Sequence, residues 1–165
     1  MKTIFFIRHA KSSWDQPGLS DRERPLNERG LRDAPFMAKM LAGKGFRLDH
    51  IVSSPATRAF TTAGYFAQAF GIPQEQIEVN REIYEAWPNE IMRIVQQLPD
   101  EYNTVAIFGH NPTFTTMANH FASQFLDYLP TCGIARVEAD ISSWKQLNEE
   151  SGKLVEIFFP KQFAR

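Results

Sequence analysis

The 165-residue sequence has little cysteine, no excess of charge of one sign and no long hydrophobic run, and each absence excludes a class of protein. The single cysteine, Cys132, cannot form an internal disulfide, which argues against a disulfide-stapled scaffold and fits a reducing compartment. Eighteen Lys and Arg residues are balanced by nineteen Asp and Glu residues. A nucleic acid or an anionic membrane is therefore not expected as the main partner.

Hydrophobic runs are too short for membrane insertion or export. No stretch approaches the ~20 apolar residues of a membrane span. The apolar run near the N-terminus covers Ile4 to Ile7 and stops at Arg8, whereas a signal peptide needs about 7–15 such residues. We therefore expect no membrane association and a cytoplasmic location.

What the sequence does contain is typical of one globular domain. Apolar residues make up 43% and charged residues 22% of the chain, which are ordinary values for a folded protein. The length corresponds to about one domain, and no repeat, low-complexity tract or linker divides it. We expect a single domain over residues 1–165.

Short apolar runs alternate with patterns of helical period. Strands are predicted near residues 4–7, 46–53, 76–80, 104–108, 134–140 and 154–159, and helices near 27–42, 59–70, 88–98 and 114–125. Pro35 should kink the first helix or delay its start. This alternation predicts an α/β three-layer sandwich around a mostly parallel sheet of about six strands. The last two strands lack a helix between them, so one edge should be antiparallel.

Candidate functional residues follow three of the predicted strands. The first strand ends in Arg8-His9, the second leads through Ser53-Ser54-Pro55 to Arg58, and the fourth leads into Gly109-His110-Asn111-Pro112. Ligands of open α/β sheets bind outside the carboxyl ends of the strands. Two of these ends are also helix N-termini, which favour anions. The combination predicts a site for a dianion such as a phosphoryl group.

Each of these residues also has an ordinary interpretation when it is taken alone. Arg8 could be a solvated charge at a strand end, His110 a structural histidine and Arg58 a surface residue. Their occurrence together at strand ends that face one crevice favours a common functional site.

Four segments resemble the histidine phosphatase superfamily, and in particular its SixA-type phosphohistidine phosphatase branch. The family hallmark is a strand that ends in Arg-His-Gly, which here reads Arg8-His9-Ala10. The other segments that carry the resemblance are 24–30, 53–59 and 109–112, in the family's order and spacing. The resemblance implies the phosphoglycerate mutase-like fold for the whole chain.

The resemblance also implies roles for individual residues. His9 would be the nucleophile that becomes phosphorylated, while Arg8, Arg58 and His110 would bind the phosphoryl oxygens. Asn111, in the last motif, is included among the expected substrate-binding residues.

A general acid is less sharply indicated. Ile83-Tyr84-Glu85 is similar to the pattern in which many relatives carry one, which makes Glu85 the first candidate, with Glu82 and Asp21 as alternatives. Mutase-like relatives often have Asn where this chain has Asp15, which argues against a mutase role.

Metal and cofactor chemistry is not indicated, because His50 and His120 show no ligand spacing with the other two histidines. We expect a metal-independent phosphatase that needs no cofactor and acts on phosphohistidine in a partner protein. Two alternatives stay open: the same chemistry on a small phosphate monoester, and a non-catalytic phosphate-binding module.

Overall fold

The computed structural model describes residues 1–163 and contains one six-stranded sheet in the order β3-β2-β4-β1-β5-β6. The first four strands in this order pair in parallel, whereas β5 pairs antiparallel with β1 and β6 antiparallel with β5. This confirms the predicted mostly parallel sheet with one antiparallel edge. The strands are β1 (Lys2–Arg8), β2 (His50–Ser53), β3 (Glu78–Val79), β4 (Thr104–Gly109), β5 (Ile134–Ala139) and β6 (Gly152–Phe158).

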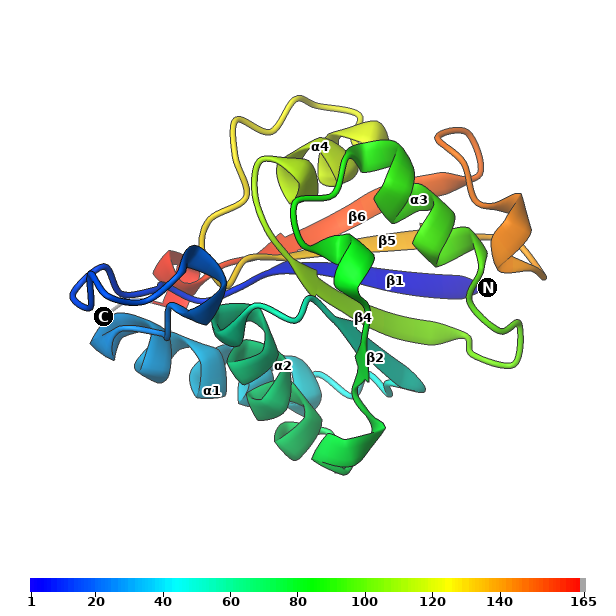
Figure 1. Cartoon of the computed structure of the whole chain (residues 1–165). Helices are drawn as coiled ribbons and strands as arrows, with labels where there is room; N and C mark the ends of the chain where they lie inside the picture. Colours follow the sequence, from blue (N-terminus) through cyan, green and yellow to red (C-terminus); the bar gives the residue numbers. More distant parts are fainter. Residues whose placement is uncertain (164–165) are drawn as a thin grey trace.

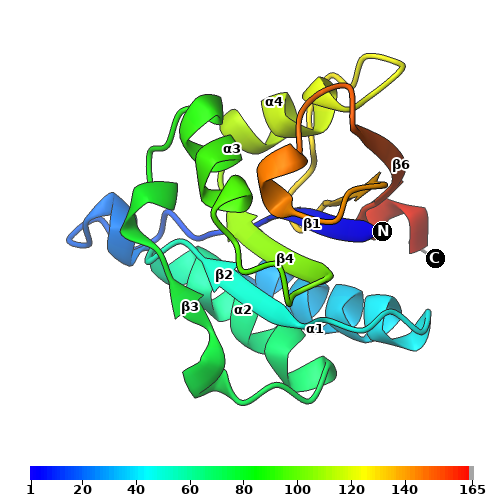
Figure 2. The same cartoon turned by 90° about the vertical axis from the view of Figure 1, so that its right-hand side faces the viewer.

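Helices cover both faces of the sheet. One face carries α1 (Glu28–Gly43) and α2 (Thr57–Ala69), and the other carries α3 (Pro88–Gln96) and α4 (Thr113–His120) (Figure 1). The view in Figure 2 shows these layers from the end of the sheet, with β3 at its edge. The predicted three-layer α/β architecture is therefore confirmed.

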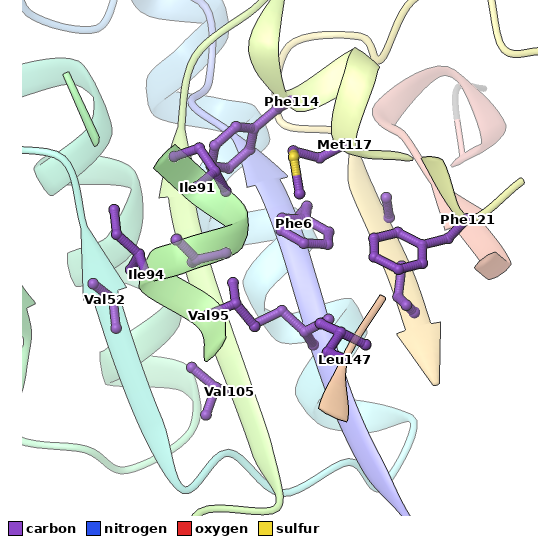
Figure 3. Packing of buried hydrophobic residues seen from close by; sticks show 14 of the residues in the cluster. Phe6, Val52, Ile91, Ile94, Val95, Val105, Phe114, Met117, Phe121 and Leu147 are labelled. Atoms are coloured by element: carbon purple, nitrogen blue, oxygen red, sulfur yellow. The ribbon is translucent and has the colours of Figure 1, made fainter. Parts of the chain in front are cut away.

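Strand β1 lies inside the sheet and is buried on both faces, as its continuous apolar run predicts. Ile4 and Phe6 pack toward α3 and α4, whereas Phe5 and Ile7 pack toward α1 and α2. Figure 3 shows Phe6 among aromatic and sulfur-bearing side chains of the first face, and its ring centroid lies 5.9 Å from that of Phe114. The strand that ends in the candidate site is thus held by two hydrophobic layers.

Helix α1 starts where the sequence predicts, and Pro35 does not delay its start. The side chain of Asn27 accepts a hydrogen bond from the Gly30 amide at 2.9 Å and caps the first turn. Gly30 is also required by close packing, since a Cβ at this position would lie 2.2 Å from the Lys11 carbonyl oxygen. The first turn of α1 is therefore packed directly against the segment that follows β1.

Three elements are clearly shorter than predicted, and one of them is β2, which starts at His50 instead of residue 46. The third strand has only two residues, at the exposed edge of the sheet, instead of the five residues 76–80. Helix α4 ends at His120 because the side chain of Asn119 bonds both backbone groups of Leu126, which closes a loop. Phe125, the last residue of the predicted helix 114–125, lies outside the helix as a result and is 80% exposed.

No helix within residues 1–163 has the length and apolar character needed to cross a bilayer.

Candidate active site

The candidate site lies at the carboxyl ends of three neighbouring parallel strands, β2, β4 and β1. Arg8 pairs with Gly109 in the sheet register, and the His9 amide donates to the Gly109 carbonyl at 3.1 Å. The Ser54 amide donates to the Phe108 carbonyl at 3.0 Å, so the carboxyl ends of β1, β2 and β4 lie side by side in the sheet. This confirms that the topology brings the three predicted motifs to one edge of the sheet.

His9 is a buried, neutral imidazole with a defined tautomer. Only 7% of the residue is exposed, and its Nδ1 lies 2.7 Å from the Ala10 carbonyl oxygen. Because a carbonyl can only accept, Nδ1 carries the proton and Nε2 keeps its lone pair. Burial, followed by the positive field of His110, Arg58 and Arg8, lowers the pKa of His9 to about 3. The imidazole is therefore neutral at physiological pH.

His110 lies beside His9, with 5.3 Å between the ring centroids. Its Nε2 is 2.8 Å from the Ser54 hydroxyl, which itself accepts the Ala56 amide. The Ser54 hydroxyl can thus donate its proton to His110 Nε2. In the neutral ring the other nitrogen, Nδ1, then carries the proton. Burial, and then the charge of Arg58, lowers the pKa of His110 to about 4.

Arg58 is 5% exposed and is held from one side by the loop that carries η1 (Asp21–Glu23). Its two terminal nitrogens donate to the Asp21 carbonyl at 2.6 Å and to the Asp21 carboxylate at 3.0 Å. The hydroxyl of Tyr84 donates to the same carboxylate at 2.6 Å, and Arg24 donates to its other oxygen at 3.1 Å.

These contacts decide the ionisation of Asp21. Hydrogen bonds from Tyr84 and Arg58, together with the Arg58 charge, hold the pKa of Asp21 well below its usual range. Asp21 is therefore a carboxylate that positions Arg58, and it is poorly suited to the alternative role of proton donor.

Arg8 and Asn111 share one backbone acceptor. The Leu129 carbonyl accepts from Arg8 Nη1 at 3.0 Å and from Asn111 Nδ2 at 2.9 Å. The Asn111 oxygen accepts from both the backbone and the hydroxyl of Thr115. The amide of Asn111 is thus occupied in joining the start of α4 to the 121–131 loop, so that it fixes the loop that orients Arg8.

Glu85 makes no hydrogen bond to the two histidines or two arginines of the site among the described residues. It is exposed and has a left-handed backbone conformation, with φ near 60°. The hydrogen bond to Asp21, followed by burial and the charges of Asp21 and Glu85, raises the pKa of Tyr84, whose ring packs edge-on against His110 at 5.6 Å. Glu82 is also exposed and lies in η3 (Arg81–Ile83). Of the two, Glu85 is the direct sequence neighbour of Tyr84, the residue that contacts His110.

Several supporting residues were not predicted. Tyr84 and Ser54 lie inside motifs that the sequence does display, next to the residues singled out there. Thr62 accepts from the Ala10 amide and donates to the Arg58 carbonyl, and so ties the end of β1 to α2. No local pattern distinguishes Thr62 from any other helical threonine, because its two partners come from different elements.

Three buried side-chain nitrogens have no hydrogen-bond partner within the described part of the chain: Arg8 Nε, Arg58 Nε and His110 Nδ1. All three belong to the predicted site, and all three are donors. Buried donors normally have an acceptor, so these groups can bind the oxygens of an anion placed next to His9. The same described residues contain no group of three or more His, Cys, Asp or Glu arranged to hold a metal ion.

Fold and site together define an α/β protein that gathers two histidines and two arginines at the carboxyl ends of its parallel strands. The model of the histidine phosphatase superfamily (branch 1) matches residues 4–113, and the chain belongs to this superfamily. Family membership and fold support phosphatase activity and a hydrolase class for the chain.

Individual relatives agree with this assignment. A structure from Agrobacterium tumefaciens, described as a candidate phosphohistidine phosphatase SixA, is 28% identical with a TM-score of 0.80 and covers 96% of this chain and 98% of its own. The protein histidine phosphatase SixA in complex with tungstate has the same fold, with a TM-score of 0.82 at 22% identity over 98% of this chain and 99% of its own. An uncharacterised protein of Mycobacterium leprae is 28% identical over 94% of this chain and its own full length. The resemblance seen in the motifs is thereby confirmed.

Proposed function

We propose that the protein is a metal-independent phosphatase that removes phosphoryl groups from phosphohistidine in a partner protein, through a phosphorylated His9. The observation that carries the proposal is the free Nε2 of a neutral, buried His9 beside three buried donors without partners. A nucleophile that must attack phosphorus needs that lone pair, and the developing charge on the phosphoryl oxygens needs those donors.

In the first step His9 Nε2 attacks phosphorus, the bond from phosphorus to the substrate's imidazole breaks, and its electron pair goes to that ring, which already carries a proton on its other nitrogen and leaves as neutral imidazole. Arg8, Arg58 and His110 donate to the three phosphoryl oxygens. The ring of His9 becomes positive, and the Ala10 carbonyl that accepts its Nδ1 proton stabilises that charge. In the second step water attacks phosphorus, the electron pair returns to Nε2, and inorganic phosphate leaves.

The need for a general acid depends on the leaving group. An alkoxide must be protonated as it leaves, whereas an imidazole leaves with little help. We propose Glu85 as the donor where one is required, because Asp21 is held ionised by Arg58 and Tyr84. A phosphohistidine substrate makes small demands on this exposed carboxyl, which suits its loose attachment to the site.

The surroundings of the site favour a protein substrate. The segments next to the strand ends are the loops 9–27, 80–87 and 121–133, while the four helices pack on the faces of the sheet (Figure 1). A phosphorylated side chain that protrudes from a partner can reach such a site.

The test is rapid-quench labelling with a phosphohistidine peptide. A transient phosphoenzyme, labile in acid and stable in base, should form in the wild type and be absent from His9→Ala. His120→Ala is the matched control, because His120 is paired with Glu149 away from the site. Turnover should survive exhaustive chelation and should be inhibited by vanadate. Loss of turnover with EDTA that Mg²⁺ or Zn²⁺ restores would contradict metal independence. Binding of the peptide without turnover of it or of p-nitrophenyl phosphate would favour a non-catalytic binding module.

A further inference from the structure

A strongly basic hollow lies beside the phosphoryl site. Its volume is about 290 Å³, and four of its nine lining residues are cationic while none is acidic. We name it the basic pocket and define it by Arg8, Lys11, Arg29 and Lys161, with Tyr128 and Thr131 in its wall. Arg8 is shared with the site around His9, so a ligand in this pocket lies next to the phosphoryl group.

The fold assembles the basic pocket from distant parts of the chain. Lys11 follows the end of β1, and the close contact of Gly30 with the Lys11 carbonyl brings Arg29, in the first turn of α1, beside it. Lys161 lies in η5 (Pro160–Phe163), which follows β6. Because β6 runs in the same direction as β1, its end reaches the same edge of the sheet, where η5 appears in red near the end of β1 (Figure 1).

The charges of this pocket are poorly balanced by the protein itself. Asp33 contacts Arg29 at 3.4 Å, a long ion pair on an exposed guanidinium. Neither Lys11 nor Lys161 has a carboxylate partner among residues 1–163. Arg8 adds a guanidinium whose Nε is buried and unpartnered. The pocket therefore attracts an anion, and its position next to the phosphoryl site makes that anion a second group of the same substrate.

The hollow continues away from His9, which favours an extended ligand. A neighbouring hollow of about 430 Å³ shares Arg29, Pro160 and Lys161 with the basic pocket and is lined at its far side by Phe36 and Phe163. The two aromatic rings contact each other, with 5.6 Å between their centroids. A compact metabolite would occupy one of these hollows, whereas a peptide segment can follow both.

We propose that the basic pocket binds carboxylate side chains of the partner protein that flank the phosphohistidine. This inference rests on the proposed function and adds to it the chemistry of the substrate surface: an acidic segment on one side of the reactive histidine. The pocket would act on substrate affinity, since its lysines lie outside the group of residues that surround the phosphorus.

The experiment compares three phosphohistidine peptides of equal length, with Glu on the N-terminal side, Glu on the C-terminal side, or Gln in both places. For the wild type, kcat/KM should be about three- to tenfold higher for one Glu peptide than for the Gln peptide, mainly through KM, as two partly exposed ion pairs provide. The preference should shrink as ionic strength rises. The combined substitution Lys11→Ala and Lys161→Ala should remove it.

Lys145→Ala with Lys153→Ala is the matched control, because these exposed lysines lie toward the opposite edge of the sheet. Turnover of p-nitrophenyl phosphate normalises every variant for the chemistry at His9. Affinities of the same peptides without the phosphoryl group, measured by fluorescence polarisation, test the pocket independently of hydrolysis.

The outcomes separate the two proposals. Equal kcat/KM for all three peptides, or a preference that the Lys11 and Lys161 substitutions leave intact, would overturn the acidic segment and leave the phosphohistidine phosphatase standing. Tighter binding of a Glu peptide that depends on both lysines, without hydrolysis of any phosphohistidine peptide, would support the pocket and overturn the proposed substrate.

Discussion

Cationic side chains are buried at both ends of the parallel strands, but their hydrogen bonding differs. We call the side of the sheet where these strands begin the amino edge and the side where they end the carboxyl edge. At the amino edge Lys2 is 2% exposed, and its amine donates to the carbonyls of Asp100 and Tyr102 and to the Asn103 side chain, at 2.8–3.0 Å. At the carboxyl edge Arg58 is 5% exposed and keeps a buried Nε without a partner.

The histidines follow the same division. His50, at the start of β2, pairs with Glu78 at 2.8 Å, whereas His110 has a buried Nδ1 without a partner among residues 1–163. Burying a polar group without a partner costs about 1–3 kcal/mol, so an unsatisfied cluster persists where a ligand can satisfy it. The comparison teaches that buried polar groups with hydrogen-bond partners mark the amino edge, which has a structural role, and that buried donors without partners mark the carboxyl edge, where the candidate site lies.

The comparison predicts that His9→Ala causes the largest loss of activity. Removing the nucleophile should lower turnover by at least ~10³-fold, or about 4 kcal/mol in the barrier. His50→Ala, at the amino edge, should stay within about twofold of the wild type. Steady-state kinetics with p-nitrophenyl phosphate and with a phosphohistidine peptide measure both variants. Activity of His9→Ala within tenfold of the wild type would remove His9 from the nucleophile role.

Glu85→Gln should separate leaving groups. General acid catalysis is worth about 10²–10⁴-fold where the leaving group needs a proton. We expect a loss of at least ~10²-fold in kcat/KM on an alkyl phosphate, whose wild-type rate should already be poor, and little loss on a phosphohistidine peptide. Equal small losses on both substrates would move the search for the acid to Glu82. A wild type that prefers the alkyl phosphate, together with a large loss in Glu85→Gln, would instead indicate a small-molecule phosphatase.

The low pKa values of His9 and His110 predict a loss of stability in acid. The unfolded state binds a proton to each near its ordinary pKa of about 6.5, while the folded state stays neutral down to about 3 and 4. The contribution of the two neutral histidines to the free energy of unfolding is therefore fully present above pH ~6.5. It is lost as the pH falls toward their pKa values in the folded state. At pH 5 each histidine should cost about 2 kcal/mol of unfolding free energy relative to pH 7.

Urea unfolding of the wild type and His9→Ala at both pH values measures this effect. The variant should lose about 2 kcal/mol less than the wild type between pH 7 and pH 5. An identical pH dependence for the two proteins would mean that the pKa of His9 is not depressed.

Lys2→Met should have the smallest effect of these changes. It should lower the free energy of unfolding and leave turnover nearly unchanged. It leaves three acceptors without their donor and should reduce the free energy of unfolding by about 1–2 kcal/mol. Its kcat should remain within about twofold of the wild type. Arg58→Met should reverse this pattern, with a large fall in kcat/KM. Similar activity losses in the two variants would break the distinction between the edges.

Much of the fold could be predicted because local patterns carry it. Three such patterns depend on residues close together in sequence: the continuous apolar run of β1, the Asn27 cap of α1, and the alternation of apolar and charged residues in β5. The prediction failed at α4, where the periodicity of its apolar residues continues to Phe125 but the side chain of Asn119 closes a loop first. A competing side-chain hydrogen bond ended the helix, and apolar spacing does not report such bonds.

The sequence by itself determined which residues reach the carboxyl edge of the sheet, since hydrophobic periodicity sets where each strand ends and the next residues must emerge there. Arg8, His9 and His110 were located by that reasoning alone. Only the tertiary structure decided their chemical state. The low pKa of His9 depends on its burial, and the hydrogen bonds between Asp21 and Arg58 join residues 37 positions apart. The approach of Lys161 to Arg8 depends on β5, which pairs with both β1 and β6, because packing between distant segments is set by the complete fold and not by any local pattern.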